Sequence, residues 1–133
     1  MKFLLICLFL IYATNAAVIP KEKEELGRQL LALCSAEVGI SEDKVMTLRD
    51  GNFDNVDGEV KCVIECGFKK TGFMTADGVF QPDFTISAIS MSGVDSPKAP
   101  EAVNKCKDET GSGNCEKAFN IFSCMFREFG PIF

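Results

Sequence analysis

Apolar and polar residues recur along this chain with the period of an α-helix. Between Lys21 and Val38, the apolar residues Leu26, Leu30 and Leu33 are spaced three and four residues apart, which places them on one face of a helix. Gly39 follows directly and is predicted to end that helix. Ser, Thr and Val are too dispersed for strands with a period of two. The pattern therefore predicts an all-α fold.

Five more short helices are predicted from the same periodicity and from residues typical of helix ends. Ser41 is expected to cap the second helix, and Gly51 is expected to end it. Ser96 and Pro97 are expected to be the N-cap and first residue of the fifth helix. The expected spans are residues 42 to about 49, 57 or 58 to about 72, 82 to about 92, 97 to about 110, and 115 to 129.

The first segment of the chain differs from the rest. Residues 3–12 are all apolar and follow a single basic residue, Lys2, and a run of small residues comes next. This order is typical of a secretory signal peptide, and ten apolar residues are too few to span a bilayer core of about 30 Å. We expect cleavage after Ala16, with Ala17 as the alternative. Residues 1–16 are then the signal peptide, and residues 17–133 form a single secreted, extracellular domain with no membrane insertion.

The composition excludes several classes of function. The 133 residues contain no His and no Trp, and the formal net charge is −5. Without His, neither a Ser-His-Asp triad nor a Cys-His pair nor a His-ligated zinc site can form. The 14 basic residues against 19 acidic ones disfavour binding to the phosphates of nucleic acid. We therefore expect no enzymatic activity, no nucleic-acid partner, no metal and no cofactor.

Six cysteines remain when Cys7 leaves with the signal peptide. An even number in a secreted chain indicates three disulfides. Cys62 and Cys66 are four residues apart, so they lie on one face of the third helix and can join it to two different segments. Spacing alone does not choose among the fifteen pairings that six cysteines allow. The six residues are Cys34, Cys62, Cys66, Cys106, Cys115 and Cys124.

The cysteine spacing resembles that of the insect odorant-binding proteins, the pheromone- and general-odorant-binding family. The matching features are the three-residue gap between Cys62 and Cys66, the eight-residue gaps between the last three cysteines, and the lengths of the two longer intervals. Residues 72–80, with the sequence GFMTADGVF, are similar to the family's turn after the third helix. Residues 115–119 are similar to the start of its sixth helix. The resemblance covers the mature chain from end to end.

This resemblance implies six helices around an internal hydrophobic cavity, with the disulfides Cys34–Cys66, Cys62–Cys115 and Cys106–Cys124. It implies a carrier that binds odorants or pheromones and transports them through extracellular fluid. A carrier of lipids or hormones in a non-sensory secretion is the alternative with the same fold, and a secreted interaction protein with a filled core is the alternative from another class. The implied partners are a small apolar or fatty-acid-like ligand and an olfactory receptor, and the chain is expected to be a monomer or a weak homodimer.

The resemblance also suggests which apolar residues line the cavity, although each of them could instead be an ordinary core residue. Ten of the twelve Phe residues lie after the signal peptide, where Tyr and Trp are absent, so the aromatic surface offers shape and dispersion rather than hydrogen bonds. Phe133 is expected to fold over the opening with the tail 130–133, and a frayed tail is the alternative. The expected ligand-binding residues are Leu30, Phe68, Phe73, Phe80, Ile86, Ile89, Met91, Ala118, Phe122, Met125 and Phe133. Hydroxyl groups that could add polar selectivity are those of Thr71, Thr75, Thr85, Ser87 and Ser123.

Overall fold

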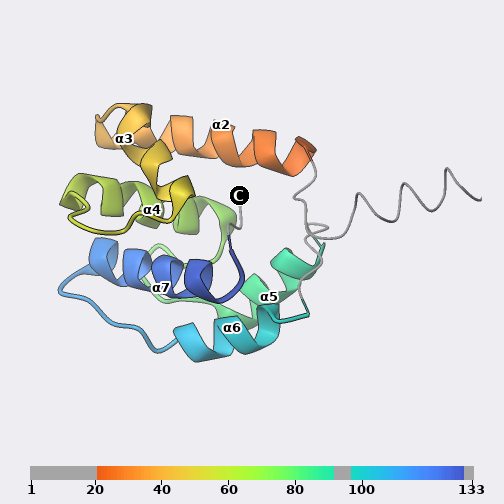
Figure 1. Cartoon of the computed structure of the whole chain (residues 1–133). Helices are drawn as coiled ribbons and strands as arrows, with labels where there is room; N and C mark the ends of the chain where they lie inside the picture. The colour runs from red at the N-terminus through yellow and green to blue at the C-terminus, as the bar shows by residue number, and fades with distance from the viewer. Residues whose placement is uncertain (1–20, 92–96, 131–133) are drawn as a thin grey trace, which may run out of the picture.

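The computed structural model describes residues 21–91 and 97–130, and these ranges form an all-α fold (Figure 1). Outside the helices, the described residues contain a single antiparallel β-bridge, between Met74 and Phe80. The predicted fold class is therefore confirmed. The α-helices are α2 (Lys21–Val38), α3 (Glu42–Met46), α4 (Gly58–Thr71), α5 (Pro82–Met91), α6 (Ala99–Cys106) and α7 (Asn114–Phe129), and a 3-10 turn, η1 (Thr47–Asp50), follows α3.

Several helix ends follow from local residues, as the sequence indicates. The Ser41 side chain accepts a hydrogen bond from the backbone N–H of Asp43 at 3.3 Å, and it thereby caps α3. Gly51 ends η1 with a φ of +77°, a left-handed conformation that glycine adopts without steric cost. The second predicted helix is therefore present in two parts, because its last turn tightens into η1.

The fifth predicted helix begins and ends elsewhere. Its structural counterpart, α6, starts at Ala99 with Lys98 as the N-cap, whereas Pro97 lies in the turn that precedes it. Pro100 falls in the first turn of α6, where the missing N–H of proline is not needed by the helix. A second proline three residues further on thus marks the helix start, and the helix ends at Cys106 instead of near residue 110.

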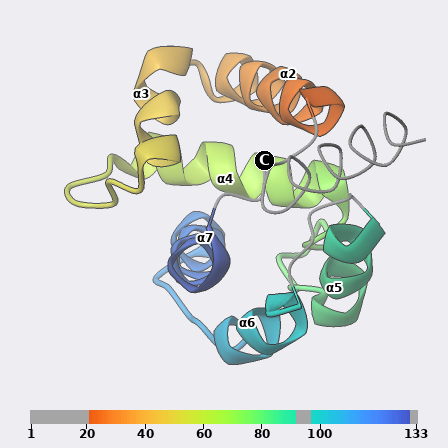
Figure 2. The ribbon, with the colours of Figure 1, turned by 45° about the vertical axis from the view of Figure 1, so that its right-hand side comes forward.

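The helix α4 lies at the centre of the fold. It lies between α2 and α7, and α6 lies on the other side of α7 with α5 beside it (Figures 1 and 2). The apolar side of α4 is buried against α7, and this contact forms the middle of the hydrophobic core. The buried residues on the two helices include Val60, Val63, Ile64 and Phe68 of α4 and Ala118, Ile121, Phe122 and Met125 of α7.

Three disulfides join these helices in the pairing that the resemblance implies. Cys34–Cys66 joins α2 to α4, Cys62–Cys115 joins α4 to α7, and Cys106–Cys124 joins α6 to α7. They span sequence separations of 32, 53 and 18 residues. Loops of this length correspond to about 3–4 kcal/mol of stabilisation each in the chain-entropy estimate. The central helix is therefore held covalently to a neighbour on each side.

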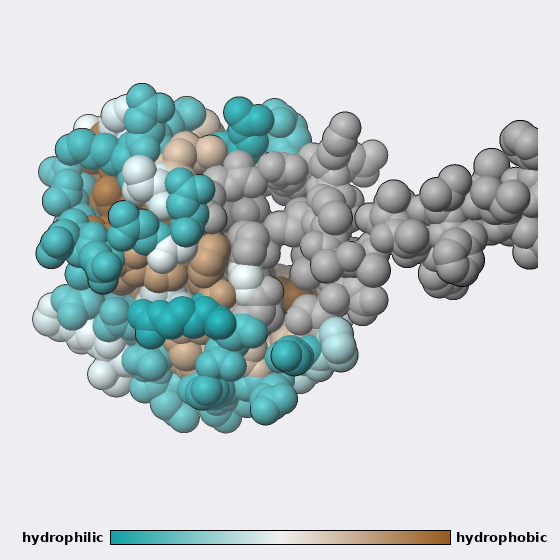
Figure 3. Space-filling view, viewed as in Figure 1, coloured by the Kyte–Doolittle hydropathy of each residue, from teal (hydrophilic) through white to brown (hydrophobic). Residues whose placement is uncertain are grey.

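The face of the molecule in Figure 3 is mostly hydrophilic, and apolar residues show in smaller patches between the hydrophilic ones. None of the helices in the described ranges is long and apolar enough to cross a membrane. Some large apolar side chains are nevertheless exposed. Leu26 of α2 and Phe84 of α5 are 57% and 52% exposed, and the Phe84 ring lies beside that of Phe73 with the centroids 6.5 Å apart.

Candidate functional site

An apolar cavity lies between α2 and the C-terminal part of α4. Its volume is about 150 Å³, and most of the surface that lines it is carbon. From α2 it is lined by Leu26, Gly27 and Leu30, from α4 by Gly67, Phe68 and Thr71, and from the segment after α4 by Phe73. The cavity is thus formed by one turn of each helix and by the turn that follows α4.

The turn after α4 positions the aromatic part of the wall. Gly72 has a φ of +85° and redirects the chain, so that Phe73 folds back onto Phe68 with the ring centroids 5.8 Å apart in an edge-to-face arrangement. The N–H of Met74 donates to the carbonyl of Phe68 at 3.1 Å, and the N–H of Gln81 donates to the carbonyl of Phe73 at 2.7 Å. These bonds hold the turn against the end of the helix.

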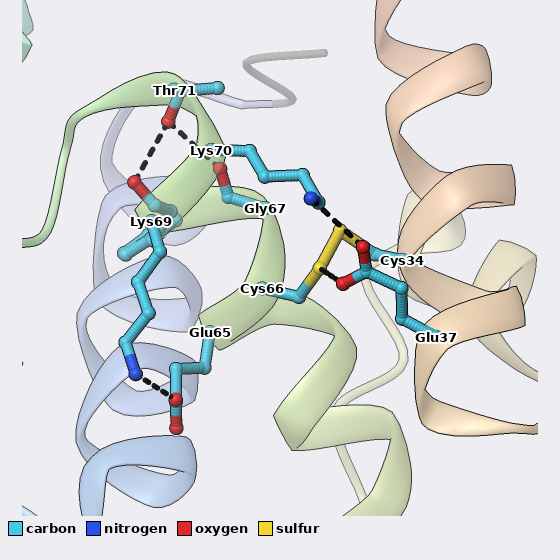
Figure 4. The surroundings of a disulfide bond; sticks show 9 residues. Cys34, Glu37, Glu65, Cys66, Gly67, Lys69, Lys70 and Thr71 are labelled. Carbon is cyan, nitrogen blue, oxygen red and sulfur yellow. Dashed lines mark hydrogen bonds and ion pairs between the residues drawn. A yellow bond between two sulfur atoms is a disulfide. The ribbon is translucent and has the colours of Figure 1, made fainter. Parts of the chain in front are cut away.

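The disulfide Cys34–Cys66 connects the same two helices beside the cavity (Figure 4). On the solvent side of this disulfide, Glu37 of α2 pairs with Lys70 of α4 at 3.0 Å. The other carboxylate oxygen of Glu37 lies 3.3 Å from the Cys66 Sγ, a polar contact without a shared proton because the sulfur is in a disulfide. One covalent and one ionic link therefore set the separation of the helices that form the cavity.

The single hydroxyl group of the wall belongs to Thr71. It donates to the carbonyls of Gly67 and Phe68, at 2.9 and 3.1 Å, one turn earlier in the same helix (Figure 4 shows the bonds). The hydroxyl proton of Thr71 is therefore used within α4, and the hydroxyl oxygen can only accept a hydrogen bond from a ligand. Recognition within this cavity consequently depends mainly on shape and dispersion.

A wider depression lies elsewhere, between the starts of α4 and α7. It is about 660 Å³ in volume, and the half-buried disulfide Cys62–Cys115 lies among its walls. Charged residues line much of the remainder, namely Asp57, Glu59, Lys61 and Glu116. Because this depression is shallow and carries charges of both signs, it suits an apolar molecule less well than the cavity between α2 and α4.

Comparison with known proteins assigns the chain to a family. The PBP/GOBP family matches residues 16–128. The chain belongs to the PBP/GOBP family. Two relatives match over nearly their whole length: general odorant-binding protein 56a of Drosophila melanogaster is 27% identical over 126 residues, covering 93% of this chain and 88% of that protein. B1 protein of Tenebrio molitor is 28% identical over 130 residues, covering 95% and 97%.

Solved structures of this family share the fold. The fatty acid binding protein OBP56a from the oral disk of the blowfly Phormia regina is 27% identical, with a TM-score of 0.62, and the match covers 84% of this chain and 94% of that one. Odorant binding protein 5 of Apis mellifera is 21% identical, with a TM-score of 0.69 and coverage of 86% and 99%, which supports the fold alone. The resemblance to insect odorant-binding proteins is therefore confirmed. The PBP/GOBP family is a family of carriers of small hydrophobic ligands rather than of enzymes.

The residues expected to line the cavity of this PBP/GOBP chain lie in different parts of the structure. Leu30, Phe68 and Phe73 lie together in the wall of the cavity between α2 and α4. Phe80 is buried and packs on Phe68 with the ring centroids 6.2 Å apart. Met91 is 84% exposed at the end of α5, and Phe133 lies outside the described residues. The roles of these residues beyond the cavity wall stay predictions.

The other expected residues are buried or half-buried in the core. Ile89 of α5 and three residues of α7 are buried, whereas Ile86 is half-buried and packs against the same core. The three on α7 are Ala118, Phe122 and Met125. Contact with a ligand stays a prediction for each of them.

Three residues of the cavity wall were missed by sequence reasoning, namely Leu26, Gly27 and Gly67. Leu26 shares a helical face with Leu30, and that spacing was the available signal. The two glycines have no side chain, and a pattern of apolar side chains cannot indicate such positions.

Among the hydroxyls named as sources of polar selectivity, those of Thr71, Thr75, Thr85 and Ser123 are engaged in local hydrogen bonds. Thr85 and Ser123 are buried and donate to carbonyls of their own helices, those of Gln81 at 2.7 Å and Asn120 at 3.2 Å. The Thr75 hydroxyl accepts from the N–H of Val79 within the turn at 3.0 Å. Thr71 is thus the hydroxyl, among those expected, that the structure places in the wall of the described cavity.

Phe53 is a further aromatic residue that the sequence did not single out. It lies in the loop between η1 and α4, and its ring meets those of Phe119, Phe122 and Phe126 edge-on, with centroids 5.9, 5.9 and 5.1 Å away. The Lys61 ammonium lies over the Phe119 ring, 5.2 Å from its centroid. This aromatic cluster packs along one side of α7. Because α4 lies between α7 and α2, the cluster is separate from the cavity between α2 and α4.

Proposed function

We propose that this chain is a secreted carrier that binds a small apolar molecule between α2 and the C-terminal part of α4 and transports it through extracellular fluid. The observation that carries the proposal is the apolar cavity between two helices that a disulfide holds together. The carrier performs no chemistry on its ligand. Secretion follows from the expected signal peptide, residues 1–16, and agrees with membership of the PBP/GOBP family.

The size and chemistry of the cavity support a ligand with a compact apolar part. The cavity volume of about 150 Å³ is similar to that of an engineered apolar cavity in another protein that takes up benzene. A ligand that buries roughly 300 Å² of apolar surface gains about 7–8 kcal/mol at 25 cal/mol/Å², from which the cost of ordering is subtracted. A dissociation constant near the micromolar range is therefore the expected affinity.

Two classes of ligand fit this proposal, volatile odorants or pheromones and fatty-acid-like lipids. The second class is supported by the name of the blowfly relative, which describes a fatty acid binding protein. A fatty acid would place part of its chain in the cavity and extend the remainder through the opening beside Leu26 and Phe73. For the sensory role, the proposed protein partner is an olfactory receptor, and the carrier itself is proposed to be a monomer or a weak homodimer.

The test is a titration of residues 17–133, oxidised and freed of bound lipid, with an apolar dye that becomes fluorescent in a dry site. One saturable site in the micromolar range, from which members of a panel of volatiles and fatty acids displace the dye, is the expected result. The panel members that compete decide between the two ligand classes. Absence of any saturable site would contradict the proposal and favour an interaction protein with a filled core.

A matched pair of variants locates the site. Leu30→Gln adds a polar group to the cavity wall and should weaken binding of the competing ligands at least about tenfold, because an amide would be buried without a partner. Leu33→Gln makes the same change three residues away on α2, at a side chain that is 53% exposed and outside this wall. It should leave the affinity unchanged. Equal affinities for the two variants would place the ligand elsewhere.

A further inference from the structure

Two of the residues that line the cavity are glycines inside α-helices. Gly27 lies in α2 and Gly67 in α4, both are buried, and both border the cavity from opposite helices. Glycine is less favourable than alanine inside a helix, because it loses more conformational freedom on folding. A buried glycine at such a position therefore requires a reason.

The backbone does not supply that reason at Gly67. Gly67 has ordinary helical geometry, unlike Gly72, whose φ of +85° disfavours any side chain. A Cβ at position 67 would have the Leu30 Cδ2, at 3.8 Å, as its nearest atom, which is an ordinary van der Waals distance. An alanine would therefore fit at this position in the empty protein. Because glycine has a hydrogen in place of a side chain, it leaves the space between α2 and α4 open.

We propose that Gly27 and Gly67 set the width of the cavity, so that a ligand group as broad as a ring or a branched carbon enters between the two helices. The inference rests on the proposed carrier function and adds to it the shape of the ligand. Phe68 and Phe73 form the side of the space and Leu30 faces Gly67, so a methyl group added at position 67 points into the volume that the ligand occupies. A ring loses this space, whereas an unbranched chain can pass beside the methyl group.

Calorimetric titration of the oxidised protein with two probes tests the proposal. Cuminyl alcohol carries a branched ring and n-decanol an unbranched chain, and the two have the same number of carbons and one hydroxyl each. Wild-type protein should bind both probes. Gly67→Ala should weaken the binding of cuminyl alcohol at least about fivefold more than the binding of n-decanol, because the added methyl group overpacks a space that the ring fills. Gly27→Ala should change the preference in the same direction.

Gly58→Ala is the matched control. It makes the same substitution at the first residue of α4, where a Cβ has no atom within 4 Å and the cavity is not reached. It should leave both affinities unchanged. Thermal unfolding should show Gly67→Ala to be at least as stable as wild type, because alanine favours the helix and meets no close neighbour.

If Gly67→Ala lowers the affinity for the two probes equally, or lowers neither, the proposal is overturned. So would a clear fall in the melting temperature of Gly67→Ala, since the glycine would then be required by packing rather than by the ligand. If the wild-type protein binds neither probe while the dye still binds, the ligand shape inferred here is wrong and the carrier function stands. If the wild-type protein also binds no dye, the proposed function itself fails.

Discussion

Replacing Phe53 by alanine tests whether the aromatic cluster on α7 holds the loop 51–57 in place. Phe53 is half-buried, and its ring meets three rings of α7 edge-on, with interplanar angles of 78°, 87° and 85°. An edge-to-face pair contributes about 0.5–1.5 kcal/mol beyond the burial of its surface. Burial of roughly half of the side chain adds about 1 kcal/mol. With each of the three ring pairs taken near the lower limit, because Phe53 is only half-buried, the expected loss in the free energy of unfolding is about 3 kcal/mol, close to the lower end observed for fully buried Phe→Ala changes.

The assay is urea unfolding of the oxidised domain, followed by far-UV circular dichroism. Fluorescence is unsuitable, because the chain has no Trp and its single Tyr, Tyr12, precedes the expected mature domain. Phe84→Ala is the control, since Phe84 is 52% exposed and makes one ring contact among the described residues, with Phe73 at 6.5 Å. Phe84→Ala should lower the free energy of unfolding by less than about 1 kcal/mol. Equal losses for the two variants would refute the role assigned to the cluster.

Four other predictions use the same protein. The buried Ser35 hydroxyl has no hydrogen-bond partner among the described residues, so Ser35→Ala should leave the free energy of unfolding unchanged or raise it by up to about 1 kcal/mol, and a clear loss in urea unfolding would show that the hydroxyl is paired. Removing Cys62–Cys115 by a double Cys→Ala change should cost about 4 kcal/mol and removing Cys106–Cys124 about 3 kcal/mol, because they span 53 and 18 residues, and the reverse order would contradict this estimate. The hydrogen bond from Lys105 to Glu128, at 2.6 Å, raises the pKa of Lys105 above its ordinary value of 10.5, so its contribution to stability is present below pH 10.5 and is lost as the pH rises through the raised pKa. The wild-type protein should therefore lose stability in that range more steeply than Lys105→Gln, and identical alkaline profiles of the urea midpoint would contradict the assignment. Because the chain has no His, affinity for the displaced ligands should change less than about twofold between pH 7 and 6 in the dye assay, and a sharp loss above pH 6 would show this to be wrong.

The helices were largely predictable because their signals are local. The apolar period and the flanking glycine predicted α2 with its observed bounds, and Ser41 predicted the cap of α3. The start of α6 was misplaced because Pro97 and Pro100 both suit a first helical turn, and the choice between them depends on how the preceding segment packs. The disulfide pairing came from a family resemblance, since spacing alone leaves the pairing open.

The cavity was only partly predictable from the sequence. Leu30, Phe68 and Phe73 were expected in its wall because they are large and apolar, and the structure places them there. Gly27 and Gly67 were missed because apolar periodicity reports side chains that can be buried, whereas a cavity depends on side chains that are absent. Phe53 was missed because it lies in a polar loop, and a single aromatic residue without periodic neighbours carries no signal of burial.

The sequence by itself determined the class of fold, most helix bounds, the exclusion of His-dependent chemistry and, through its cysteines, the family. Those features depend on residues a few positions apart, on which residue types are present at all, or, for the family, on the intervals between cysteines along the chain. The tertiary structure alone decided which apolar faces pack closely and which stay apart. The separation of α2 from α4 depends on a disulfide between residues 34 and 66 and on an ion pair between residues 37 and 70, and the space between the helices is bordered by two glycines 40 positions apart. A void exists only between surfaces, and both surfaces are in place only when the chain has folded.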